Sequence, residues 1–171
     1  MAALLLNPGS AVSGWGFPVR GRIIPDRLKK GDLVGLVTPG SPVTGEQLQG
    51  TIDKLEKLGF RTTFRDTVLS SYGYFAGPDR ERAEELMTMF AREDVKGIWC
   101  VRGGYGSVRI LDLLDFDVIR SNPKVFFGYS DITALLNAIF QKTGLVTFHG
   151  PLGISEFNHF AVRSIKKVIM D

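Results

Sequence analysis

Short apolar segments alternate with amphipathic helical patterns along most of this chain, and this alternation restricts the possible folds more than any other feature. The apolar segments are 33–37, 60–64, 96–101, 124–128 and 146–149. Strands that are apolar throughout, with helices between them, are typical of parallel sheets covered on both faces. The sequence therefore predicts an α/β fold, namely a doubly wound, mainly parallel sheet with helices on both faces, of the Rossmann-like type.

Helix signals occupy the intervals between these strands. Thr44 and Gln47 have capping-box spacing before the first helix, and Gly59 is suited to end it. Asp79 is expected to cap a second helix, which runs to about Ala91 and has a charged exposed face. Further helices are expected over residues 110–114, over 132–140 and from about 158.

The regular pattern begins at Pro25 and fits one domain. With 171 residues, of which 44% are hydrophobic, the chain can bury a core of ordinary size. We expect residues 1–21 to form an irregular arm and residues 22–171 to form the α/β domain. The apolar start, Met1–Leu6, is similar to the tail of an export signal without its basic leading region. An unstructured lead-in or a tag remnant fits these residues equally well.

The charge pattern argues against several classes of partner. The chain has 21 basic and 18 acidic residues and a net charge of +3, with no Lys/Arg run that could follow a phosphate backbone. Nucleic acid is therefore not an expected partner. No apolar stretch approaches the ~20 residues that span a bilayer, so no membrane span is expected. The single cysteine, Cys100, lies in an apolar run, where a buried structural thiol is expected.

Three loops follow strands at the sheet edge where doubly wound folds bind ligands, namely 38–42, 102–107 and 128–131. The last loop joins an apolar strand directly to a helix, which places Ser130 at the apex of a sharp turn, as in a nucleophile elbow. A helix N-terminus there would favour an alkoxide and a tetrahedral oxyanion. The backbone N–H of Asp131 could be one oxyanion donor, and the Gly103-Gly104 segment could supply another.

Other interpretations of these loops stay open on the residues alone. A serine before a helix is usually only an N-cap, and Ile132 stands where the common hydrolase signature has its second glycine. The segment Gly104-Tyr105-Gly106 is similar to a dinucleotide-binding turn, but Arg109 occupies the place of the third glycine.

The two histidines give no clear site. His149 could complete a triad with Ser130, with Glu156 or Asp131 as the orienting acid. A histidine at the end of a strand, however, more often makes a structural hydrogen bond. His159 is expected at an exposed helix start. Neither histidine has Cys or carboxylate residues at ligand spacing, so neither a metal site nor a cofactor is expected.

A string of motifs in a fixed order adds a family resemblance. Its segments are 96–107, 114–117, 123–124, 128–133 and 147–151. Together they resemble the LD-carboxypeptidase family of serine peptidases over about residues 25–156. The loop 73–77 follows the same pattern with Asp79 and Arg82, which we expect to be structural.

The resemblance implies a Ser-His-Glu hydrolase that removes the terminal D-alanine of murein tetrapeptide in peptidoglycan recycling. The resemblance also implies that Ser130 is the nucleophile and that the backbone N–H groups of Asp131 and Gly104 form the oxyanion hole. By the same resemblance, the murein peptide would contact Arg102, Gly103 and Tyr105. A homodimer in the cytoplasm is expected by resemblance, and the apolar N-terminus makes export the alternative.

The chain also departs from the family pattern. In this family the catalytic Glu and His belong to a C-terminal domain, and the sequence ends at Asp171, before that domain. A serine without its general base is a poor nucleophile, so we expect the isolated chain to be inactive. Two alternatives remain. One is a microcin-immunity-type peptidase that cleaves aminoacyl-nucleotide antibiotics, and the other is a non-catalytic module that binds a small ligand.

Overall fold

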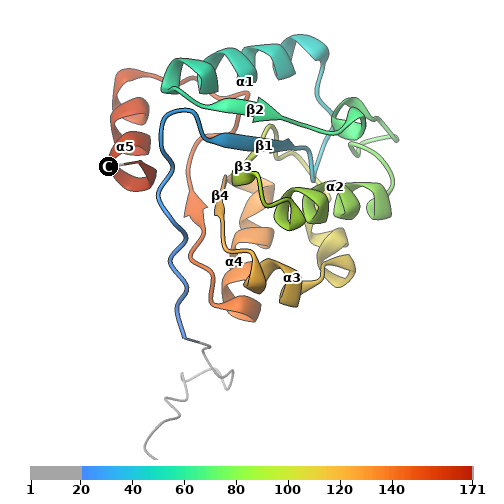
Figure 1. Cartoon of the computed structure of the whole chain (residues 1–171). Coiled ribbons are helices and arrows are strands. Elements are labelled where there is room, and N and C mark those ends of the chain that lie inside the picture. The colour runs from blue at the N-terminus through green and yellow to red at the C-terminus, as the bar shows by residue number, and fades with distance from the viewer. Residues whose placement is uncertain (1–20, 171) are drawn as a thin grey trace, which may run out of the picture.

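The computed structural model describes residues 21–170 and places their five strands in one sheet (Figure 1). The strands are β1 (Leu33–Val37), β2 (Arg61–Thr63), β3 (Val95–Cys100), β4 (Val125–Gly128) and β5 (Phe148–His149). They are ordered β2-β1-β3-β4-β5, and all neighbouring pairs are parallel. Apart from Gly21, the expected N-terminal arm with its signal remnant lies outside the described residues.

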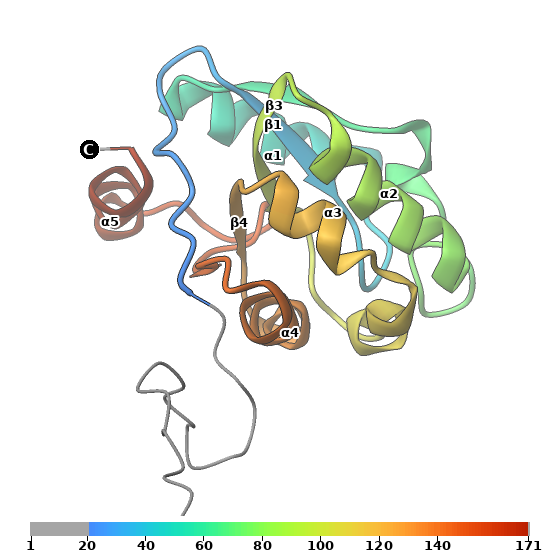
Figure 2. The same cartoon turned by 60° about the horizontal axis from the view of Figure 1, so that its bottom comes forward.

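Helices cover both faces of this sheet, which confirms the doubly wound α/β class (Figures 1 and 2). They are α1 (Gly45–Leu58), α2 (Asp79–Ala91), α3 (Phe116–Ser121), α4 (Thr133–Thr143) and α5 (His159–Ile169). Helices α1 and α5 share one apolar cluster with Trp99 and Phe127 of the sheet. Helices α2, α3 and α4 share the other cluster with Ile98 and Phe126.

The predicted ends of α1 are confirmed. The hydroxyl of Thr44 accepts a hydrogen bond from the Gln47 N–H at 3.2 Å, and the Gln47 side chain accepts one from the Thr44 N–H at 3.0 Å. Gly59 ends the helix with a φ of 99°, a conformation that glycine adopts without steric cost. The capping box and the glycine stop thus fix where α1 begins and ends.

The expectation for α2 was wrong in two respects. Asp79 is the first helical residue rather than the cap, because its carboxylate pairs with the guanidinium groups of Arg82 and Arg109. The charged side of the helix is also partly buried. Arg82 is 1% exposed and Glu85 is 2% exposed, because both bind loops at the carboxyl end of the sheet.

Two further segments differ from the prediction. The single short helix expected after the glycine loop is a 3-10 helix, Ser107–Leu113, followed by α3, which the Asp115 carboxylate caps. The fifth strand starts at Phe148 instead of Val146, because the Val146 N–H donates to the Ile23 carbonyl oxygen. The chain before β1 therefore pairs with this segment.

Cys100 lies at the end of the central strand β3 with no exposed surface, as predicted. Burial raises the pKa of its thiol well above the ordinary value. Within residues 21–170, none of the helices combines the length and the apolar character that a membrane span requires.

The order of the strands has a switch point between β1 and β3. The chain leaves β1 for β2 on one side and later enters β3 on the other side of β1. The loops after β1 and β3 leave the carboxyl ends of these strands, where folds of this type bind ligands. This switch point lies next to β4 and its continuation into Ser130.

Candidate active site

Ser130 lies directly after β4 in a strained backbone conformation. Its φ is +62°, and it is the one non-glycine residue with positive φ in the described part of the chain. A single 3-10 turn, Ser130–Ile132, separates β4 and Tyr129 from α4, and Ser130 is exposed to solvent. Non-glycine residues rarely occupy this region unless the surrounding structure holds them there. The chain therefore passes from strand to helix within a few residues, with Ser130 in the strained position.

The three predicted loops meet beside Ser130. A Cβ atom on Gly103 would lie 3.4 Å from the Ser130 Cβ atom and 3.4 Å from the Asp131 nitrogen. A Cβ atom on Gly40 would lie 2.2 Å from the Gly103 carbonyl oxygen, so only glycine fits at position 40. The Ser41 N–H donates to that same carbonyl oxygen at 2.8 Å. The loops after β1, β3 and β4 thus form one packed cluster.

Two backbone N–H groups in this cluster are available to a ligand. Those of Asp131 and Gly104 donate to no acceptor among residues 21–170. The next N–H along the loop, that of Tyr105, donates to the Ser41 hydroxyl at 3.1 Å and is occupied. Free N–H groups next to a nucleophile are what an oxyanion hole requires.

Ser107 anchors Asp131 at both its backbone and its side chain. The Ser107 hydroxyl donates to the Asp131 carbonyl oxygen at 2.5 Å, and the Ser107 N–H donates to the Asp131 carboxylate at 2.9 Å. Ser107 has no exposed surface. The Asp131 carboxylate is therefore committed to holding the glycine loop against the start of α4. The sequence analysis missed Ser107, whose only signal was its place directly after the glycines.

Arg82 of α2 connects three loops through its guanidinium group. Its Nη1 group donates to the carbonyl oxygens of Pro39 and Gly106, and its Nε group donates to that of Gly77 at 3.1 Å. The structural role expected for Arg82 is thus a clamp on the loops after β1 and β3. Asp79, its ion-pair partner, also pairs with the exposed Arg109.

Glu85, one turn further along α2, holds the end of β1. Its carboxylate accepts the Thr38 N–H at 2.7 Å and the Thr67 hydroxyl at 3.2 Å. Burial raises the pKa of Glu85 to about 7, although the hydrogen bonds from Thr38 and Thr67 favour the ionised form. The sequence analysis did not identify this residue.

The two predicted substrate-contact side chains flank the glycine loop. Arg102 is partly buried, and its Nη1 group donates to the Pro42 carbonyl oxygen at 2.8 Å. Tyr105 is 65% exposed, and its ring stacks on Phe75 with ring centroids 6.0 Å apart. Both residues therefore hydrogen-bond to the loop after β1, close to Ser130.

Within the described residues, His149 lacks the structural hydrogen bond that its position at the end of a strand predicted. Its side chain forms no hydrogen bond with any residue from 21 to 170, so neither the expected structural bond nor a bond to Ser130 exists there. Its ring instead lies edge-on to Tyr129, with centroids 6.0 Å apart. His159 is exposed at the start of α5, as expected.

An exposed serine on a sharp strand-to-helix turn, beside free backbone N–H groups, is the arrangement that α/β hydrolases use for a nucleophile. The chain belongs to the LD-carboxypeptidase family. The family model described as the LD-carboxypeptidase N-terminal domain matches residues 34–150. This match contains the three loops around Ser130.

Individual relatives agree with this assignment. The chain is 41% identical over 152 residues to the probable murein peptide carboxypeptidase of Bacillus subtilis, covering 86% of this chain and 48% of the relative. It is 35% identical to the microcin C7 self-immunity protein MccF of Escherichia coli, covering 76% and 39%. The crystal structure of an MccF-like protein from Bacillus anthracis superposes with a TM-score of 0.79 at 36% identity, covering 84% and 46%. The chain thus spans about half the length of the relatives that it matches.

Proposed function

We propose that Ser130 is the nucleophile of a serine carboxypeptidase that releases the terminal D-alanine of murein tetrapeptide in peptidoglycan recycling. The observation that carries this proposal is the left-handed, exposed Ser130 beside the free N–H groups of Asp131 and Gly104. Similarity to a probable murein peptide carboxypeptidase supports the substrate class.

In the proposed reaction, the Ser130 Oγ atom attacks the carbonyl carbon before the D-alanine and loses its proton to a general base. The carbonyl oxygen becomes an oxyanion that accepts hydrogen bonds from the Asp131 and Gly104 N–H groups. The base then protonates the leaving amine, D-alanine departs, and water hydrolyses the acyl-enzyme to restore the Ser130 hydroxyl.

We infer that the general base comes from outside the described residues. No side chain of residues 21–170 forms a hydrogen bond with Ser130. We therefore propose that the base is the Glu-His pair of a second domain, as the family resemblance implies, and that the 171-residue chain alone is inactive. The two domains together would then enclose the substrate.

Arg102 and Tyr105 are the proposed substrate contacts. The guanidinium of Arg102 retains nitrogens that bind no residue of the described range, and guanidinium groups bind carboxylates well. The free carboxylate of D-alanine is the matching group on the substrate. The exposed ring of Tyr105 offers an apolar surface to the peptide at the opposite side of the glycine loop.

Release of D-alanine from murein tetrapeptide tests these proposals. We would assay the 171-residue chain and the longest product of the native gene, each with a Ser130→Ala control. The expected result is Ser130-dependent release by a product that contains the second domain and none by the 171-residue chain. Release by the 171-residue chain that disappears in Ser130→Ala would contradict the proposal of an external base.

A second candidate function is that of an immunity-type peptidase acting on aminoacyl nucleotides. It is favoured by the similarity to MccF, one solved structure of which holds aspartyl sulfamoyl adenosine and superposes with a TM-score of 0.82 at 30% identity. Comparison of hydrolysis rates on murein tetrapeptide and on an aminoacyl sulfamoyl nucleoside separates the two. Faster cleavage of the nucleoside would favour the immunity-type function.

Covalent trapping of Ser130 distinguishes a serine hydrolase from a non-catalytic binding module. A serine-directed phosphonate is expected to label Ser130 in the two-domain product. Absence of labelling, together with unchanged ligand affinity in Ser130→Ala, would favour the binding module.

The assembly and compartment that we propose follow from the family alone. They are a homodimer, tested by light scattering, and the cytoplasm, tested by fractionation of cells that express the native gene. Recovery of the protein from an exported fraction would instead favour the signal interpretation of Met1–Leu6.

A further inference from the structure

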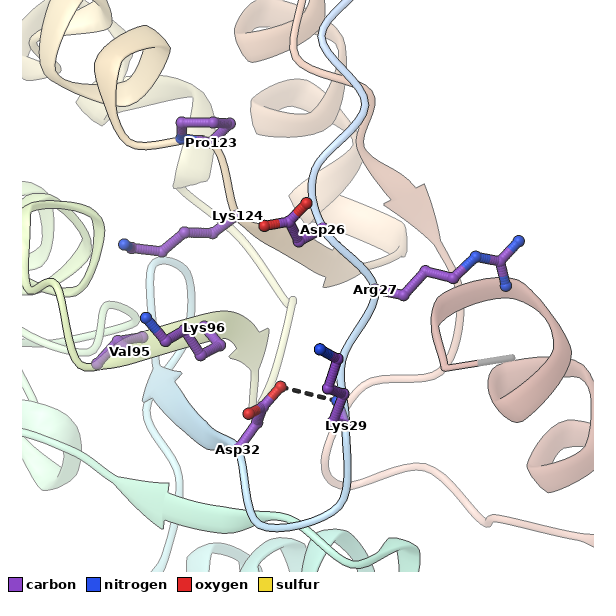
Figure 3. A pocket seen from close by; sticks show the side chains of 8 residues that line it. All are labelled: Asp26, Arg27, Lys29, Asp32, Val95, Lys96, Pro123 and Lys124. Atoms are coloured by element: carbon purple, nitrogen blue, oxygen red, sulfur yellow. Dashed lines mark hydrogen bonds between the residues drawn. The ribbon is translucent and has the colours of Figure 1, made fainter.

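A hollow lined mainly by charged side chains lies at one end of the sheet (Figure 3). It has a volume of about 560 Å³ and is lined by residues at the entrances of three strands. Asp32 directly precedes β1, Lys96 is the second residue of β3, and Lys124 directly precedes β4. Because all strands are parallel, these residues gather at the amino ends, whereas Ser130 lies at a carboxyl end.

Lys124 is the unusual member of this group. It is only 7% exposed, yet its ammonium group forms no hydrogen bond or ion pair with any residue from 21 to 170. The ammonium nitrogen itself still reaches solvent, because Glu81 Oε1 is the single fully buried side-chain N or O atom without a partner in the described residues. Lys96 extends from the neighbouring strand in the same direction (Figure 3). Burial first, and then the charge of Lys96, lower the pKa of Lys124. Two like charges are thus held close together.

The charges of Asp94 and Glu93 act in the opposite direction on the pKa of Lys124, but neither carboxylate forms a hydrogen bond or ion pair with Lys124 or Lys96. The Lys96 ammonium donates to the Glu93 carbonyl oxygen at 2.8 Å, which carries no full charge. Asp26 and Asp32 also line the hollow, but neither forms an ion pair with a lysine of the described range. Asp32 instead accepts the backbone N–H of Lys29 at 2.7 Å.

We propose that this hollow binds a small phosphate monoester, with Lys96 and Lys124 on the phosphate group. A dianion compensates both ammonium charges, whereas a carboxylate compensates only one. Lysine is a common phosphate ligand because its charge is compact. The hollow exceeds the volume of a phosphate group, and the free carboxylate oxygens of Asp26 and Asp32 can accept hydrogen bonds from hydroxyl groups on the remaining part of the ligand. The expected ligand is thus a phosphorylated polyol or sugar.

Calorimetric titration of the 171-residue chain tests the proposal, with glycerol phosphate, inorganic phosphate and glycerol as the probes. Glycerol phosphate and inorganic phosphate are expected to bind and to compete, and glycerol is expected not to bind. Lys124→Met, which retains the length of the buried chain, should weaken glycerol phosphate binding by about tenfold or more, because a charge-assisted hydrogen bond is lost. The matched control is Lys142→Met on the exposed face of α4, which should bind as the unchanged chain does.

Lys96→Gln provides a second variant at an exposed position of β3. It should also weaken binding severalfold. Equal affinity of the unchanged chain, Lys96→Gln and Lys142→Met would overturn the proposal. So would the absence of binding with both phosphate probes, or binding of glycerol as tight as that of glycerol phosphate. None of these outcomes depends on the reaction proposed for Ser130.

Discussion

Ser130 combines an exposed hydroxyl with a backbone conformation that an L-residue seldom adopts. Its φ of +62° costs about 1–2 kcal/mol for a residue with a Cβ atom. The packed loops around it supply the contacts that hold this conformation. The strain therefore arises from the backbone conformation at position 130 and not from the hydroxyl group.

This separation predicts that Ser130→Gly is more stable than Ser130→Ala. Glycine removes the Cβ penalty but loses more backbone entropy on folding, so we expect a difference of about 1 kcal/mol in the free energy of unfolding. Urea denaturation of the two variants measures it. Equal stability would mean that the surrounding loops relax the turn once the serine is gone.

Glu85 predicts a dependence of stability on pH. Its pKa in the folded chain, about 7, lies above its ordinary value of 4.5. The folded state therefore holds the proton more tightly, so the stabilisation is complete below pH 4.5 and is lost as the pH rises through about 7. The loss is on the order of 3 kcal/mol. Glu85→Gln, whose amide oxygen can still accept the Thr38 N–H, should lack this component.

The measurement is the difference in unfolding free energy between Glu85→Gln and the unchanged chain at a series of pH values. The unchanged chain should lose stability relative to the variant as the pH rises. A difference that stays constant with pH would show that Glu85 keeps an ordinary pKa in spite of its burial.

At the scale of elements, the loops after β1 and β3 are joined by a contact that only glycine allows. Gly40→Ala would place a Cβ atom 2.2 Å from the Gly103 carbonyl oxygen, so these loops would have to separate. We expect a loss of about 1–3 kcal/mol in stability, as for other overpacked sites. In the two-domain product, Ser130-dependent release of D-alanine should also fall.

Gly50→Ala in α1 is the matched control, because a Cβ atom there meets no other atom within 4 Å. Alanine favours the helix over glycine, so this variant should gain about 0.5–1 kcal/mol. Thermal unfolding compares both variants with the unchanged chain. A loss of stability in Gly50→Ala similar to that of Gly40→Ala would contradict the role assigned to the loop contact.

At the scale of the whole molecule, Cys100 reports on the opening of the core. It is the single cysteine of the chain, and it lies without exposed surface at the end of the central strand. A thiol reagent should label it only through unfolding of the sheet. The labelling rate is therefore expected to rise with urea in parallel with global unfolding, and rapid labelling of the folded chain would mean that this end of the sheet opens locally.

The sequence predicted the layers of the molecule better than its internal connections. The apolar strands, the ends of α1 and the three loops at one sheet edge all follow from local patterns, and Ser130 follows from its place between a strand and a helix. The buried contacts of Arg82 and Glu85 do not. Their partners are backbone groups of distant loops, such as the Pro39 carbonyl oxygen, and a backbone group carries no mark in the sequence.

The position of Asp79 illustrates the same limit. Its place before an amphipathic segment predicts a cap, but two arginines compete for its carboxylate, and one of them, Arg109, is 30 residues away. His149 was likewise assigned a hydrogen bond from its position alone, whereas the structure gives it an aromatic neighbour, Tyr129. A local sequence pattern predicts the element on which a side chain lies. Only the packed fold determines which group that side chain contacts.

The left-handed turn at position 130 also bears on how this domain would evolve. Selection for folded protein alone would favour glycine or asparagine at that codon, because both tolerate positive φ better than serine does. In a library randomised there and sorted only for solubility, we expect serine to be lost. A lineage that retains serine keeps an unfavourable backbone conformation together with the hydroxyl group. Such retention would indicate that selection acts on the chemistry of the hydroxyl group.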